Sequence, residues 1–348
     1  MKRPVTSLHV PAALAFALAL GGHPAQAAQG VPPSMPQIVP QIPPAPVVMP
    51  APTPPLDPLL VLQMALRNYL LAAESGNSQA QNHLGFLFER GQAVAQDLET
   101  AVKWYAKAAA QNDPLGIYNL GRMLISGRGV GQDINKAVSL LTSAAEMNVA
   151  SAQLQMALLH ELGIGVPASQ ELALFWLKQA AELGEPTAQN KLGIKLMRGE
   201  GGAVDVPQAM EWFTRAAEAG NAEAQVNLGL ILKEGLADVP ADPARAANWF
   251  ALAAGQGNTP AMPKLAAMYE QGLGMPKNLR EAVYWYYRAA EAGHAPSAGR
   301  LGWLHETGAL GRPDPALARL WYQQAAKAGD IDAQNNLARL DKAKPGKR

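Results

Sequence analysis

The sequence contains no cysteine, so this chain of 348 residues can form no disulfide, no thiolate metal site and no cysteine nucleophile. An excess of charge of one sign is also missing, because the formal net charge is +1. Without Lys2, Arg3 and the four basic residues of 342–348, 23 basic and 28 acidic residues remain, a net charge of −5. Proteins that bind DNA or RNA normally carry a basic stripe. The composition therefore argues against nucleic acid as a partner.

Motifs for catalysis are nearly absent as well. The pairs His160-Glu161 and His305-Glu306 begin like H-E-x-x-H, but Ile164 and Ala309 stand where the second histidine would be. No S-x-x-K, S-D-N or K-T-G is present, which removes the residues of serine acylation. The sequence therefore predicts no metal site, no cofactor and no enzymatic activity.

What the chain does have is a repeat of about 36 residues. A pair of the Leu-Gly type recurs in steps of 36, with one step of 37, at Leu84-Gly85, Leu120-Gly121, Met156-Ala157, Leu192-Gly193, Leu228-Gly229, Leu265-Ala266, Leu301-Gly302 and Leu337-Ala338. Paired alanines keep the same step from Ala72-Ala73 to Ala325-Ala326. Self-similarity at this period is typical of stacked helical repeats.

Each repeat predicts two antiparallel helices. In the unit that begins at Asn221, apolar residues at helical spacing run from Ala224 to Leu232, and Gly235 ends this first helix. A second apolar face follows at 246–254. We interpret the polar residue before each second helix as an N-cap rather than as a metal ligand, at Asp97, Asp133, Ser169, Asp205, Asp242, Asn278 and Asp314. The regular phase of the second-helix tryptophans predicts core positions for Trp104, Trp176, Trp212, Trp249, Trp285 and Trp321.

The repeat pattern also resembles a known family. A-Q-x-x-L-G at Ala80–Gly85, G-x-G-V at Gly127–Val130 and D-x-x-x-A-x-x-W-Y-x-x-A-A at Asp97–Ala109 resemble the Sel-one-like repeat family, a branch of the tetratricopeptide-type helical repeats. The resemblance covers residues 59–340. It implies an all-α, right-handed superhelical solenoid of antiparallel helix pairs, with about seven 36-residue repeats and a half-repeat at each end. The family turn also accounts for the glycines at 127–131, which lack the G-K-[ST] of a phosphate loop.

The two ends of the chain have a different composition. Residues 1–27 are typical of a secretory signal, with Lys2 and Arg3, an apolar run and the small-x-small site at 25–27. We expect a periplasmic or secreted protein with no stable membrane insertion after cleavage; anchoring by an uncleaved signal is the alternative. Residues 28–58 are interpreted as a proline-rich linker and residues 341–348 as a short basic tail.

The expected function is an exported, non-catalytic scaffold for protein–protein interaction. In tetratricopeptide geometry the first helices line a concave face, where a protein or peptide partner would bind. Arg, Trp and Tyr are frequent interface anchors. The predicted contacts are Tyr118, Arg122, Lys191, Asn227, Lys264, Arg300 and Trp303. Two alternatives remain: binding of cell-wall glycan or exopolysaccharide, which a row of exposed aromatic residues and carboxylates would favour, and a lactamase-like cell-wall hydrolase.

Overall fold

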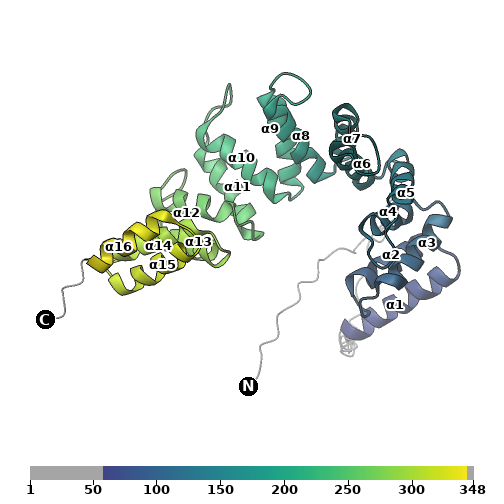
Figure 1. The fold of residues 1–348 in the computed structure, drawn as a ribbon, viewed down its shortest axis with the longest axis horizontal. Coiled ribbons are helices and arrows are strands. Elements are labelled where there is room, and N and C mark those ends of the chain that lie inside the picture. The colour runs from purple at the N-terminus through teal and green to yellow at the C-terminus, as the bar shows by residue number, and fades with distance from the viewer. Residues whose placement is uncertain (1–57, 343–348) are drawn as a thin grey trace, which may run out of the picture. The chain divides into compact units, whose positions relative to one another are not determined.

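The computed structural model describes residues 58–342, which form sixteen α-helices (Figure 1). They are α1 (Pro58–Glu74), α2 (Ser78–Arg90), α3 (Leu98–Ala110), α4 (Pro114–Ser126), α5 (Ile134–Glu146), α6 (Ala150–Leu162), α7 (Gln170–Glu182), α8 (Pro186–Arg198), α9 (Val206–Glu218), α10 (Ala222–Glu234), α11 (Pro243–Gly255), α12 (Ala261–Gln271), α13 (Leu279–Glu291), α14 (Ala295–Thr307), α15 (Pro315–Lys327) and α16 (Ile331–Lys342). The predicted all-α solenoid is confirmed. The expected signal, nearly all of the expected linker and most of the basic tail lie outside the described residues.

The helices follow one another as repeated pairs. Each even-numbered helix from α2 to α14 is the first helix of a unit, and the odd-numbered helix after it is the second. Every first helix packs against its own second helix and against the second helix of the preceding unit. By its place in the repeat, α1 is a second helix and α16 a first helix; neither has its own unit partner among the described helices.

The polar residues before the second helices are N-caps, as predicted. Asp97 accepts the backbone N–H of Thr100 at 3.0 Å, and Asp133 accepts that of Lys136 at 3.0 Å. The other five predicted caps accept backbone N–H groups in the same way. These bonds satisfy amides that the first helical turn leaves unpaired. The recurring acids are therefore explained by helix capping.

A buried glutamine on most first helices explains the A-Q of the motif. Gln81 Nε2 donates to the carbonyl oxygen of Ala73, at the end of the preceding second helix, at 2.9 Å. Gln153, Gln189 and Gln225 make the same bond at 3.0–3.1 Å. Because helix ends leave carbonyls without partners, each glutamine joins one unit to the last turn of the unit before it.

The core places a small residue of the first helix against a large residue of the second. A Cβ added to Gly85 would lie 2.5 Å from the ring of Tyr105, and one added to Gly229 would lie 2.8 Å from the ring of Phe250. Phe250 is 0% exposed, whereas Trp249 is only partly buried at the edge of the same cluster. The prediction that the tryptophans form the core is thus corrected by one residue: the fully buried position follows them, because it faces the small residue.

The turn glycines pack one unit onto the next. Gly129 has a φ of +69°, and a Cβ there would lie 2.4 Å from the carbonyl oxygen of Leu98 on the preceding second helix. A Cβ added to Gly201 would lie 2.5 Å from the side chain of Leu174 on α7. The second glycine of G-x-G is therefore required for contact between units. Within residues 58–342, no helix is both long and apolar enough to span a bilayer.

Candidate functional site

The seven predicted contact residues lie on first helices of five units. Tyr118 and Arg122 belong to α4, Lys191 to α8, Asn227 to α10, Lys264 to α12, and Arg300 and Trp303 to α14. Six are partly buried, and Trp303 is 40% exposed. The structure therefore distributes them along the first-helix side instead of gathering them into one cluster. Their role as partner contacts stays a prediction.

Two of the predicted arginines already have partners within the chain. Arg122 Nη1 donates to Glu89 Oε1 at 2.9 Å, and the hydroxyl of buried Tyr105 donates to Glu89 Oε2 at 2.9 Å. Although burial alone raises it, the hydrogen bonds from Arg122 and Tyr105 hold the pKa of Glu89 below its usual value. We call this arrangement a Glu–Tyr–Arg clasp. It spans two units and compensates the charge of Arg122.

The clasp recurs at the other end of the solenoid. Arg300 Nε donates to Glu270 Oε2 at 3.0 Å, and Tyr286 donates to the same carboxylate at 3.0 Å. Glu306, Tyr322 and Arg339 form a third clasp. The Arg300 guanidinium also stacks on Trp303, with 4.0 Å between its central carbon and the ring centroid. Trp303 thus remains the more available of the two side chains for a partner.

Other predicted contacts are also used between helices. Asn227 Nδ2 donates to Asn190 Oδ1 at 2.9 Å, and Asn119 makes the same bond to Asn82 at 2.8 Å. Tyr118 is partly buried, and this burial raises its pKa. These side chains join neighbouring first helices before any partner arrives.

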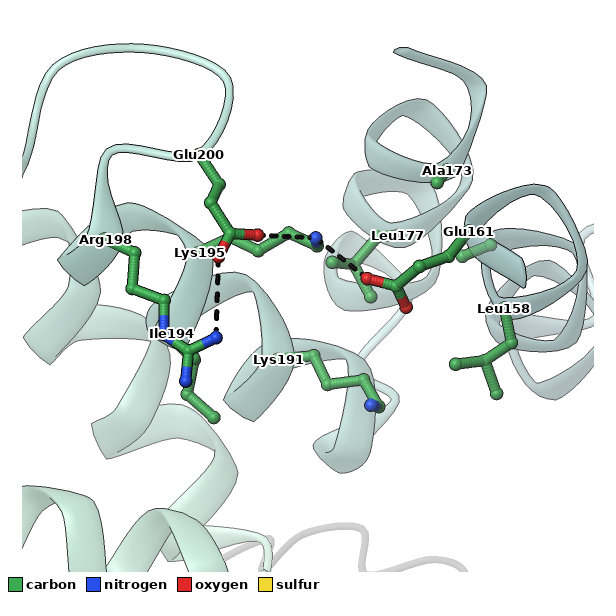
Figure 2. A pocket seen from close by; sticks show the side chains of 10 residues that line it. Leu158, Glu161, Ala173, Leu177, Lys191, Ile194, Lys195, Arg198 and Glu200 are labelled. Atoms are coloured by element: carbon green, nitrogen blue, oxygen red, sulfur yellow. Dashed lines mark hydrogen bonds and ion pairs between the residues drawn. The ribbon is translucent and has the colours of Figure 1, made fainter. Parts of the chain in front are cut away.

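A cleft opens between α6 and α8, and Lys191 is the one predicted contact that lines it. The cleft has a volume of about 200 Å³. Its walls are Ala157, Leu158 and Glu161 of α6, Ala173 and Leu177 of α7, Lys191, Ile194, Lys195 and Arg198 of α8, and Glu200 of the following turn (Figure 2). Apolar side chains and amines therefore face the same space.

Two residues at this junction are smaller than their counterparts in other units, and one of them, Leu177, lines the cleft. Leu177 stands at the position that holds Tyr105, Phe213, Phe250, Tyr286 or Tyr322 in other units. Gly202 stands where Val130, Val166 and Met275 pack against buried clusters. Gly202 lines a smaller hollow that shares Lys195 and Glu200 with the cleft, and a Cβ added to Gly202 would have no atom within 4 Å. The α4–α5 unit also has a leucine, Leu141, but Val166 of the following turn packs against the same buried cluster as Leu141. The α6–α8 junction lacks both large side chains.

An ion network crosses the mouth of the cleft. Lys195 Nζ lies 3.0 Å from Glu161 Oε1 and 2.9 Å from Glu200 Oε2, and Arg198 lies 3.5 Å from Glu200 (Figure 2). Burial lowers the pKa of Lys195, but its hydrogen bonds to Glu200 and Glu161 outweigh this and raise it. The hydrogen bond from Lys195, with a smaller contribution from Arg198, lowers the pKa of Glu200. Lys195 is therefore charged and held in place.

Lys191 differs from Lys195 because it has no ion pair within residues 58–342. Its amine ends in the space between the two first helices, below the Lys195 bridge (Figure 2). A second cleft on the other side of the bridge shares Glu161, Lys195 and Glu200 and is bounded by Phe175, which is 50% exposed. The arrangement can bind a group that combines an apolar part with a negative charge.

The histidines take part in local packing. His160 Nδ1 lies 3.2 Å from the carbonyl oxygen of Pro167, in the turn after its own helix. In the part of the chain that the structure describes, no group of three His, Asp or Glu side chains is placed to hold a metal ion.

The cleft between α6 and α8 was not predicted from the sequence. A comparison of Leu177 and Gly202 with their counterparts in the other units could have found it.

Comparisons with known proteins agree with this architecture. The Sel1 repeat model matches residues 59–77, 78–113, 114–149, 150–185, 186–221, 222–258, 259–294 and 295–330. A protective antigen of uropathogenic Escherichia coli with an SLR fold is 31% identical over 80% of this chain, with a TM-score of 0.71. This chain spans 60% of that antigen's length.

A Sel1 repeat protein of Oxalobacter formigenes is 32% identical, over 66% of this chain and 94% of its own, with a TM-score of 0.55. Among curated proteins, none matches the chain. The repeat units and the first of these solved structures together identify the fold at the level of the family. The chain belongs to the Sel1 repeat family.

Proposed function

We propose that this chain is an exported, non-catalytic scaffold that binds a protein or peptide partner on its first-helix side. Sel1-repeat solenoids are commonly protein-interaction scaffolds and are generally non-catalytic. Export is supported by the signal-like residues 1–27. In this proposal the α6–α8 cleft is the anchor site, and Tyr118, Asn227, Lys264 and Trp303 are flanking contacts.

The cleft is the main support for this proposal. In most other units an aromatic side chain at the position of Leu177 occupies this space. Leu158, Leu177 and Ile194 provide apolar walls, and the amine of Lys191 is not used by another described residue. An unpaired amine beside an apolar recess favours a carboxylate next to an apolar side chain. We therefore propose a peptide segment of the partner in which an acidic residue adjoins an apolar one.

The first experiment is affinity capture from envelope extract with the full chain and with Ala157→Gly/Leu177→Phe. The double variant restores the small-against-aromatic pair of Gly193 and Phe213 and fills the cleft without adding charge. Lys191→Glu tests the charge separately. Lys136→Glu, at an exposed site on α5, is the matched control.

The proposal expects one prey protein that the native chain and Lys136→Glu retain and that both cleft variants lose. Circular dichroism must show that the variants are folded. A prey that binds all four chains equally contradicts the cleft as anchor. If no protein is captured and the chain instead retains soluble cell-wall glycan, the protein-scaffold proposal is wrong. Fractionation of cells tests export, since recovery only in the cytoplasm would contradict it.

A further inference from the structure

We propose that copies of this chain associate head to tail, with α16 of one copy packing onto α1 and α2 of the next. The two helices would complete one repeat unit from two chains. This inference does not depend on the cleft, because it uses the terminal helices alone. It follows from what each terminal helix leaves uncovered.

At the N-terminal end, α1 exposes a face that is buried in every other second helix. By the alanine repeat, Ala65, Tyr69 and Ala72 correspond to Ala101, Tyr105 and Ala108. Those three residues of α3 are all 0% exposed, because α2 and, at Ala108, α4 cover them. Tyr69, in contrast, is 39% exposed, and Ala65 is also exposed. The first helix that would cover this face is not among the described helices.

The neighbouring surface of α2 completes the site onto which α16 of another copy would pack. We call this site the seat. His83 and Phe86 occupy the repeat positions of Asn119 and Arg122, which reach back to Asn82 and Glu89 of the preceding first helix. No first helix is described before α2, so His83 and Phe86 have no such partner. Their rings stack with each other and with Tyr69 instead. Tyr69 and His83 have centroids 4.2 Å apart, and His83 and Phe86 6.3 Å apart.

The seat is therefore a shallow groove between α1 and α2, and its floor includes Ala65, Tyr69, Ala72 and His83. Small residues beside an aromatic row suit a closely packed helix. An internal unit shows which helix fits, because Tyr105 lies against Gly85 and Tyr286 shares a buried cluster with Ala266. The occupant must carry a leucine followed by glycine or alanine.

At the C-terminal end, α16 carries this sequence and leaves it uncovered. It has the first-helix pattern Ala333-Gln334…Leu337-Ala338. Ala333, which packs toward α15, is its one buried residue. Leu337 is partly buried and Ala338 is exposed, whereas their counterparts Leu84 and Gly85 are buried. No described second helix follows to cover them.

The repeat positions then predict the contacts of the composite unit. Ala338 would lie against Tyr69, as Ala266 lies near Tyr286. Asn335 would face His83, in the way that Asn82 faces Asn119 at 2.8 Å.

At the clasp position, Lys342 replaces glutamate and would face Phe86, which replaces arginine. A lysine over an aromatic ring is a favourable substitute for the ion pair. The charges at the two ends are therefore compatible.

Because residues 58–342 of each copy provide one seat and one matching helix, the interface is heterologous and extends into a chain or closes into a ring. The test is sedimentation velocity of the full chain over a wide range of concentrations. Tyr69→Glu blocks the seat, and Ala338→Arg blocks the helix that fills it. Tyr284→Glu, at a similarly exposed tyrosine of α13, is the control.

The native chain and Tyr284→Glu are expected to associate as concentration rises, and each blocking variant is expected to weaken association at least about tenfold. Mixing the two blocked variants gives the sharpest result, because one free seat then meets one free α16. The mixture should form a dimer although each variant alone is a monomer.

A native chain that stays monomeric at every concentration overturns the proposal. So does an Ala338→Arg variant that associates as well as the native chain while Tyr69→Glu does not, since that result means that α1 pairs with α1. Circular dichroism of both blocked variants should match the native spectrum, because Tyr69 and Ala338 are exposed.

Discussion

The ends of this solenoid and its middle use the same repeat positions in different ways. Three Glu–Tyr–Arg clasps join units near the two ends, at Glu89, Glu270 and Glu306. In the middle, the tyrosine position holds Phe213 or Phe250, and the units are joined by apolar burial and by glutamine and asparagine hydrogen bonds. The comparison shows that neighbouring units can be joined with or without a clasp, and the cleft lies where Leu177 replaces the large aromatic side chain.

The two positions of the clasp change together along the chain. A buried tyrosine hydroxyl needs an acceptor, so the three tyrosines have a glutamate on the first helix of their own unit. Units with phenylalanine have Met197 or Lys233 at the glutamate position. Glu161 is the exception, because Leu177 offers it no hydroxyl, and it pairs with Lys195 across the cleft instead.

The largest effect is expected in the middle units, from Phe250→Ala. Removing a fully buried ring leaves a cavity and should lower the free energy of unfolding by about 3–5 kcal/mol. Trp249→Ala should cost less than about 3 kcal/mol, because Trp249 is only partly buried. Guanidinium denaturation followed by circular dichroism compares the two. An equal loss in both variants would contradict the burial order given above.

The clasp at the N-terminal end can be broken by Arg122→Ala. This change leaves the carboxylate of Glu89 buried without its main partner and should cost about 2 kcal/mol. Arg128 is the matched control, since it lies 3.1 Å from the same carboxylate but its side chain is 45% exposed. Arg128→Ala should cost less than about 1 kcal/mol. If both variants lost the same free energy of unfolding, Arg122 would stabilise Glu89 only through its positive charge and not through the hydrogen bonds of the clasp.

The clasps also predict a response to acid. The pKa of Glu89 and that of Glu306 lie below the usual value in the folded chain. A carboxyl with a lowered folded pKa stabilises the fold above its unfolded pKa, and this contribution disappears as the pH falls through the folded pKa. The difference in stability between the native chain and Glu89→Gln should therefore shrink below about pH 4.3. A difference that does not become smaller as the pH is lowered from 7 to 3 would contradict this origin.

The hollow beside the cleft should be fillable with a small change in stability. Gly202→Val restores the side chain that Val130 and Val166 supply in other units, at a site where a Cβ meets open space. The free energy of unfolding should change by less than about 1 kcal/mol. Thermal denaturation measures this effect. A severe loss of stability would show that the turn requires glycine.

The smallest effect is expected from removing metal ions. The aspartates before the second helices accept backbone amides, and His160 bonds within its own turn. EDTA should therefore leave the melting temperature of the chain unchanged. A large decrease would show that an ion holds part of the solenoid.

The fold could be predicted because the repeat period, the capping residues and the helix-ending glycines all depend on local sequence. The choice between Trp249 and Phe250 could not, because helical spacing places both near the core and only packing decides which one faces Gly229. The sequence pattern predicts Arg122 and Arg300 as partner contacts, but it does not reveal that each is paired with a glutamate of the preceding unit. These partners lie 33 and 30 residues away in the sequence.

The cleft was harder to predict for a different reason. It results from missing volume at Leu177, and Gly202 leaves an adjoining hollow open; neither residue is unusual by itself. Lys191 was predicted from its position on a first helix, and the structure adds that it lines the cleft.

The placement of the clasps bears on how the chain can change in length during evolution. Each clasp joins the glutamate and tyrosine of one unit to an arginine of the next helix pair or of α16. Duplication or loss of a whole unit between α6 and α11 separates no glutamate from its arginine. The same event after α3 or α13 would leave a buried carboxylate facing a residue that was not selected for it. Growth and shortening of the array are therefore least disruptive in its middle.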